Sequence, residues 1–176
     1  MASARDKTVL VVDDEPNIRQ YLRTLLEDAE FNVLTAEDGV EALRIIKEQH
    51  PDFISLDLIM PRKSGHKLLF ELKRDKALSR IPVLVVTAHA QDDLGKGDLQ
   101  DLLDNRVMSG PGTYLQKPVD PLAYVQCVQR ALGVEETQEV ADRLGIKEEL
   151  QARIQSASPE ALRQAVELLR KQGRKE

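Results

Sequence analysis

Five residues able to hold cations or anions stand at or just after the ends of short apolar runs. They are Asp13, Asp14, Asp57, Thr87 and Lys117. Carboxylates gathered at one place repel one another, which raises their pKa values and costs stability. Mg²⁺ is a hard cation that binds one or two carboxylates and keeps several waters, so it would offset this repulsion. The aspartates therefore predict a Mg²⁺ site, which Mn²⁺ could also fill.

The apolar runs that precede these residues have the character of buried strands. They cover residues 8–12, 31–36, 52–56, 81–86 and 113–115. The tetrapeptide VLVV occurs in two of them and is apolar at every position, which is typical of parallel strands covered on both faces. Amphipathic stretches lie between the runs, so we expect five β-α units in an open α/β sheet. Functional residues in such sheets gather at the carboxyl ends of the strands.

The helix boundaries are marked by capping and terminating residues. We expect Pro16 in the first turn of the first helix, Asp38 and Asp98 as caps of the second and fourth, Gly65 before the third, and Gly133 after the fifth.

Four segments in this order resemble the receiver domains of response regulators. TVLVVDDEPNIRQYL matches the family's opening, SLDLIMPRKSG its phosphorylation loop, VLVVTA its fourth strand and TYLQKP its fifth strand. The resemblance covers about residues 7–133. It implies a flavodoxin-like, doubly wound five-stranded parallel sheet of order 2-1-3-4-5, with helices on both faces. We expect a receiver domain over 1–133 and a helical extension over 134–176.

The resemblance also implies a role for each polar residue. Asp57 would accept a phosphoryl group from the phosphohistidine of a histidine kinase or a histidine phosphotransfer protein. Lys117 and Thr87 would contact phosphoryl oxygens, which require charge neutralisation and alignment. The implied metal ligands are Asp13, Asp14, Asp57 and the main-chain carbonyl of Ile59. Lys117-Pro118 is a candidate cis peptide, as in the family.

Two further pairs of residues are implied to control the switch. Thr87 would move toward the phosphoryl group while Tyr114 turns inward, and Ile59 and His89 would tune how fast the phosphate is lost. Each residue also has a purely structural alternative: Asp13 or Asp14 as a helix cap, Tyr114 as an ordinary strand aromatic, His89 as a solvent-exposed side chain. The shared order and spacing of the motifs favours the functional interpretation.

The chain departs from the family pattern between Thr87 and Lys117. These residues are 30 positions apart (117 − 87), which is longer than usual by about two helical turns. Gly95 and Gly97 predict a long loop after Thr87. The aspartates of this segment lack the spacing of a calcium loop, so a solvated helix face is favoured. Because this segment belongs to the usual signalling face, the lengthening argues against a family-typical target and a family-typical dimer. Some other homodimer remains an alternative.

The extension over 134–176 has no aromatic residue and is nearly neutral, with 8 Lys and Arg against 9 Asp and Glu. We expect helices over 139–144, 147–155 and 160–172, with Gly145 ending the first. A core this small rarely folds alone. The extension is expected to pack on the receiver, pair with another chain or stay partly mobile.

Two alternative functions compete with a receiver that controls protein–protein interaction. EVADRLGIKEELQARI resembles the first part of a helix-turn-helix, so a DNA-binding regulator is the main alternative; Glu148 and Glu149 would oppose phosphates there. A phosphatase-like enzyme is disfavoured because Ile59 stands where its second catalytic Asp would be. We therefore expect a phosphorylation-controlled module for protein–protein interaction, with an unknown target, that catalyses only its own phosphorylation and dephosphorylation.

The composition sets further expectations. The net charge of −5 and the pI of about 5.4 disfavour nucleic-acid binding. Cys127 is the only cysteine, so no intrachain disulfide is expected, which fits a reducing compartment. Residues 1–7 lack the apolar core of a signal peptide, and no apolar run reaches the roughly 20 residues that span a membrane. We expect a cytoplasmic protein.

Overall fold

The computed structural model describes residues 3–60, 64–88, 114–135 and 138–172. Its strands form one parallel sheet in the order β2-β1-β3-β4-β5, which confirms the predicted fold and strand order. The strands are β1 (Thr8–Val12), β2 (Asn32–Ala36), β3 (Phe53–Leu56), β4 (Val83–Thr87) and β5 (Tyr114–Gln116). The helices are α1 (Pro16–Asp28), α2 (Gly39–Gln49), α3 (Gly65–Arg74), α5 (Pro121–Leu132), α6 (Gln138–Ser156) and α7 (Pro159–Gln172), with 3-10 helices at Ala4–Asp6 and Leu78–Arg80.

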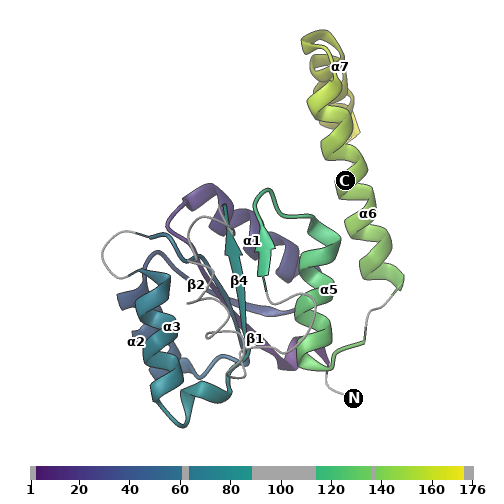
Figure 1. Ribbon diagram of the computed structural model, residues 1–176. Helices are drawn as coiled ribbons and strands as arrows, with labels where there is room; N and C mark the ends of the chain where they lie inside the picture. The colour runs from purple at the N-terminus through teal and green to yellow at the C-terminus, as the bar shows by residue number, and fades with distance from the viewer. Residues whose placement is uncertain (1–2, 61–63, 89–113, 136–137, 173–176) are drawn as a thin grey trace.

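Helices cover both faces of the sheet, and each face has its own core (Figure 1). One core packs α2 and α3 against the sheet, and the other packs α1, α5 and the start of α6 against the opposite face. Successive residues of β1 alternate between them: Leu10 and Val12 join the first core, Val9 and Val11 the second. Because both faces are covered, β1 and β4 are apolar and buried throughout their VLVV runs, as predicted.

The helix ends follow most of the capping signals in the sequence. Pro16 opens α1, and the Asp38 carboxylate accepts hydrogen bonds from two main-chain N–H groups of α2. Gly133 ends α5 in the left-handed conformation, with φ of 63°. The third helix differs slightly, because Ser64 is the cap and Gly65 is already the first helical residue. The predicted cap Asp98 lies outside the described residues.

The predicted end of a helix at Gly145 in the extension is wrong. Instead of a break at Gly145, α6 runs without interruption from Gln138 to Ser156. A single interior glycine costs only about 1 kcal/mol relative to alanine, and the surrounding residues are good helix formers. The turn that a helix-turn-helix would need at Gly145 is therefore absent from α6, all of whose backbone is described. Val140 and Leu144 bury themselves in the core shared with α1 and α5, so the start of α6 packs on the receiver.

None of the helices in the described ranges combines the length and apolar character needed to cross a membrane.

Candidate functional site

Three aspartates meet at the carboxyl edge of the sheet. Asp13 follows β1 and Asp57 follows β3, and these two strands are hydrogen-bonded neighbours. One carboxylate oxygen from each of Asp13, Asp14 and Asp57 lies within 4.8 Å of the others. Asp13 is 1% exposed and Asp57 is 5% exposed. The site is therefore a nearly buried cluster of negative charge.

Main-chain hydrogen bonds fix the orientation of the two buried carboxylates. The Glu15 N–H donates to Asp13 Oδ1 over 2.9 Å, and the Ile59 N–H donates to Asp57 Oδ1 over 3.1 Å. Burial nevertheless raises the pKa of Asp13 and of Asp57, because it disfavours the charged form more than the neighbouring donors favour it. The negative charge of Asp14 adds to the rise in the pKa of Asp57.

Lys117 brings a positive charge into the cluster from the loop after β5. Its Nζ lies 2.9 Å from Asp13 Oδ2 and 3.0 Å from Asp57 Oδ2, and 3.2 Å from Glu15 Oε1. Burial lowers the pKa of Lys117, but hydrogen bonds to Asp13 and Asp57 outweigh it and leave the pKa above its ordinary value. The ammonium is thus held charged between the two buried carboxylates. The Lys117-Pro118 peptide, which the resemblance makes a candidate, is cis.

Thr87 ends β4 on the strand next to β3, at the same edge of the sheet. Its side chain is fully buried, and its hydroxyl has no hydrogen-bond partner among the described residues. Leaving a buried hydroxyl unpaired costs about 1–3 kcal/mol. The Thr87 carbonyl accepts a hydrogen bond of 2.9 Å from the Lys117 N–H, so the backbones that carry these two residues are joined.

Gly65 allows the start of α3 to approach the main chain of Asp57 and Leu58 closely. A Cβ at this position would lie 2.1 Å from the Asp57 carbonyl oxygen and 2.7 Å from Leu58 Cα. The Gly65 N–H also donates to the Leu58 carbonyl over 3.0 Å. The start of α3 therefore lies directly against the main chain that carries Asp57, and only glycine fits there.

The donors of the cluster fit a hard divalent cation. Asp13, Asp14 and Asp57 offer only oxygen atoms, which Mg²⁺ and Mn²⁺ prefer. Two of these carboxylates are buried, and Lys117 is the only cation that the described ion pairs bring to them. A bound divalent cation would neutralise the remaining charge.

The structure brings together most of the predicted site residues. Asp13, Asp14, Asp57 and Lys117 form one cluster, and Thr87 ends the strand beside it. The Ile59 side chain is 51% exposed two residues beyond Asp57. Tyr114 begins β5, but its side chain and the whole of His89 lie outside the described residues.

Two residues of the site have no clear signal of their role in the sequence. Glu15 pairs with Lys117 although its side chain is 61% exposed, and Arg19 Nη1 donates to the Asp13 carbonyl over 2.6 Å. Glu15 directly follows the aspartate pair, and this adjacency is the signal that could have found it. Arg19 lies one turn into α1, and nothing in its spacing distinguishes it from a solvated arginine.

The family comparison agrees with this geometry. The description "Response regulator receiver domain" matches residues 9–129. The chain belongs to this family. The match ends within α5, so it covers the whole acidic cluster with Lys117 and leaves α6 and α7 outside.

Curated relatives of the receiver domain have different overall lengths. The polar-differentiation response regulator DivK of Brucella ovis is 32% identical over 128 residues, which are 72% of this chain and 97% of DivK. The probable transcriptional regulator ycf27 of Cyanophora paradoxa is 37% identical over 115 residues, which are 65% of this chain but only 44% of that protein. The chain thus spans less than half the length of ycf27.

Solved receiver domains share the fold. The chemotaxis response regulator CheY4 of Vibrio cholerae aligns with 28% identity and a TM-score of 0.60, over 72% of this chain and 98% of CheY4. The receiver domain of the sensor histidine kinase PA1611 from Pseudomonas aeruginosa aligns with 26% identity and a TM-score of 0.60, over 75% of this chain and 99% of that domain. The PA1611 domain has a magnesium ion coordinated in its active-site cleft.

Proposed function

We propose that this receiver accepts a phosphoryl group on the Asp57 carboxylate from the phosphohistidine of a histidine kinase or histidine phosphotransfer protein. The observation that carries the proposal is the position of Asp57: nearly buried at the end of β3, with the Lys117 ammonium 3.0 Å from one carboxylate oxygen. Similarity to the receiver domain of a sensor histidine kinase supports a phosphohistidine donor.

The transfer requires one bond to form and one to break. A carboxylate oxygen of Asp57 attacks phosphorus, the bond between phosphorus and the imidazole nitrogen breaks, and the donor histidine leaves as neutral imidazole after taking up a proton from solvent. Lys117 neutralises charge on the phosphoryl oxygens. The Thr87 hydroxyl, which has no partner among the described residues, donates to one of them. Hydrolysis later breaks the new O–P bond and restores the carboxylate.

The acidic cluster supports a Mg²⁺ cofactor. The ligands would be Asp13, Asp14, Asp57 and the main-chain carbonyl of Ile59. The bound cation would supply positive charge that screens these carboxylates from an anionic donor. Similarity to the magnesium-bound PA1611 domain supports the same assignment.

The aspartyl phosphate would act as a switch for protein binding. It adds negative charge and acceptor oxygens beside Thr87, whose hydroxyl has no partner among the described residues without it. Thr87 would turn to this acceptor and Tyr114 would move inward, which remodels the surface around β5 and α5. A shift of this kind requires the phosphate to favour one state by a few kcal/mol. The protein would catalyse only its own phosphorylation and dephosphorylation.

Phosphorylation with a small donor tests the proposal directly. The full chain is incubated with Mg²⁺ and acetyl phosphate, and intact mass is measured. We expect one phosphoryl group per chain, none in Asp57→Asn, and full incorporation in Asp6→Asn, a matched change at an exposed aspartate outside the cluster. Incorporation that persists in Asp57→Asn would refute the assignment. Multiple turnover of acetyl phosphate without a stable adduct would indicate a phosphatase-like enzyme instead.

Removing the metal provides a second test. EDTA in excess over Mg²⁺ should abolish incorporation, and Mn²⁺ should restore it, because both cations accept oxygen ligands. Incorporation that is unchanged in EDTA would exclude the proposed cofactor role of the acidic cluster.

A further inference from the structure

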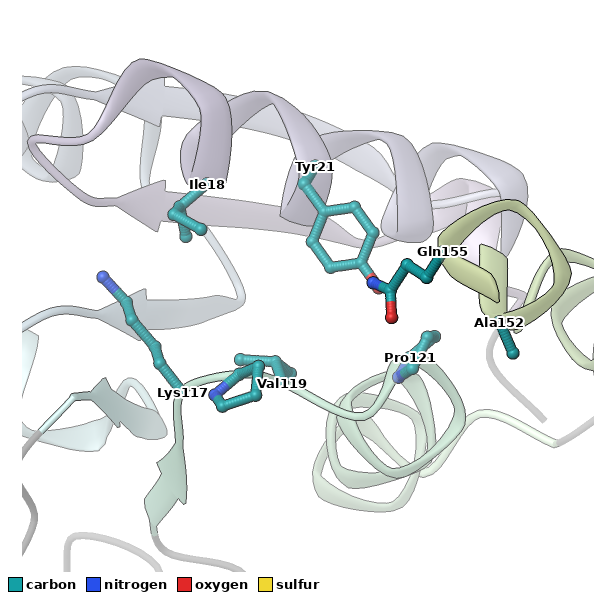
Figure 2. A pocket seen from close by; sticks show the side chains of 8 residues that line it. Ile18, Tyr21, Lys117, Val119, Pro121, Ala152 and Gln155 are labelled. Atoms are coloured by element: carbon teal, nitrogen blue, oxygen red, sulfur yellow. The ribbon is translucent and has the colours of Figure 1, made fainter. Parts of the chain in front are cut away.

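A groove of about 380 Å³ lies between α1, the loop before α5 and the last turns of α6 (Figure 2). Ile18 and Tyr21 line it from α1, Pro121 from the start of α5, and Ala152 and Gln155 from α6. Most of the lining is apolar. Two elements of the receiver and one element of the extension therefore share a single surface depression.

The side of the groove formed by α6 is held against the receiver by specific contacts. Val140 and Leu144 are buried against α1 and α5, and Arg143 Nη1 donates to the Asp28 carbonyl at the end of α1 over 3.2 Å. Leu144 and Gln155 lie about three turns apart, which puts them on the same side of the helix. The packing that buries Leu144 thus also points Gln155 toward the receiver.

The other end of the groove reaches the phosphoacceptor site. Lys117 lines the groove, and the same ammonium lies 3.0 Å from Asp57 Oδ2. Figure 2 shows the Lys117 side chain at one end of the groove and Gln155 and Ala152 at the other. A protein that delivers a phosphoryl group to Asp57 must cover the surface beside Lys117. Its apolar side chains would then lie along the apolar lining.

We propose that α6 is a recognition element for the phosphodonor protein, which docks along this groove and contacts Ala152 and Gln155 while its phosphohistidine reaches Asp57. This inference rests on the proposed function, since it assumes phosphohistidine donors. It assigns to the extension a role in selecting which donor phosphorylates the receiver. A small donor such as acetyl phosphate reaches Asp57 without occupying the groove.

The test compares protein and small donors on full-length variants. Ala152→Arg and Gln155→Arg place a long side chain in the groove, and Gln164→Arg makes the same charge change on α7, outside it. All three positions are exposed on helices, where arginine is well tolerated. Each histidine kinase and phosphotransfer protein of the source genome is radiolabelled on its histidine. The fastest donor to the unaltered chain then serves as the probe.

We expect both groove variants to accept phosphoryl groups from the probe at least about tenfold more slowly, equivalent to about 1.4 kcal/mol. Acetyl phosphate should phosphorylate all variants at the unaltered rate, and Gln164→Arg should behave as the parent with both donors. Unchanged transfer from the probe to both groove variants would overturn the inference.

Two other outcomes would also overturn it, each for a different reason. If no phosphohistidine protein transfers to the chain although acetyl phosphate phosphorylates Asp57, the proposed donor class is wrong. If light scattering shows a dimer that Ala152→Arg converts to a monomer while transfer is unaffected, a second copy of the chain occupies the groove instead.

Discussion

Replacing Gly65 with alanine would test how closely the turn after Asp57 is packed. The new Cβ would stand 2.1 Å from the Asp57 carbonyl oxygen and 2.7 Å from Leu58 Cα, whereas unstrained non-bonded carbon contacts lie at about 3.5–4.0 Å. The obstructing atoms are main-chain atoms, so the loop itself must open by about 1 Å. Overpacking of this kind costs about 1–3 kcal/mol. We expect the upper part of that range and a fall in Tm of about 4–12 °C.

Two other glycines serve as controls with different expected signs. Gly133 has φ of 63°, and an added Cβ there would meet no described atom within 4 Å, so Gly133→Ala should cost about 1–2 kcal/mol through backbone strain alone. Gly145 lies inside α6, where an added Cβ likewise has no described neighbour within 4 Å and φ is ordinary. Gly145→Ala should therefore stabilise the protein by about 0.5–1 kcal/mol.

Urea unfolding followed by far-UV circular dichroism measures all three variants on one scale. Equal m-values would show that the denatured states are comparable. Phosphorylation by acetyl phosphate should slow in Gly65→Ala alone, because only that change displaces the main chain of Asp57. A Gly65→Ala variant within about 0.5 kcal/mol of the parent would refute the steric reasoning. A destabilising Gly145→Ala would contradict a continuous α6.

Three further predictions concern the acidic site. Lys117→Met should slow phosphorylation by acetyl phosphate by on the order of 10²-fold, because it removes a preorganised positive charge. Incorporation of label measures the rate. The control Lys76→Met, at an exposed lysine, should leave the rate unchanged. Burial raises the pKa of Asp57, so the folded state binds the proton of this carboxyl more tightly than the unfolded state does. Without Mg²⁺, the free energy of unfolding of the parent, compared with that of Asp57→Asn, should therefore fall as pH rises above about 4. Urea unfolding across pH checks this, and a difference independent of pH would contradict it. Ile59→Asn should shorten the lifetime of the aspartyl phosphate by admitting water; label decay measures it, and an unchanged lifetime would exclude this role for Ile59.

Much of the fold could be predicted because the two signals involved are local. Strands buried on both faces are mostly apolar, so the VLVV runs locate β1 and β4 to within two residues. Helix caps such as Asp38 and Gly133 act on their own turn, and both behave as predicted. The meeting of Asp13 with Asp57 follows from parallel topology, because it places the ends of adjacent strands side by side.

The missed features depend on contacts between distant segments. Gly145 is a helix-ending signal in isolation, but burial of Leu144 against α1 and α5 supports a helix that continues through it. Glu15 joins the site only because Lys117, 102 positions further along the chain, comes within 3.2 Å. The groove between Tyr21 and Gln155 likewise has no local signature, since neither residue type indicates a contact surface.

The anchoring of α6 at one end makes it a lever arm. Its pivot lies at Val140 and Leu144, and Gln155 stands about 16 Å beyond Leu144 at 1.5 Å per residue. A tilt of about 5° at the pivot would move Gln155 by about 1.4 Å over such an arm. The width of the groove at that end is therefore set by the angle at which α6 leaves the core. A larger or smaller side chain at position 144 would change this angle and so the width of the groove at Gln155, although Leu144 does not line the groove.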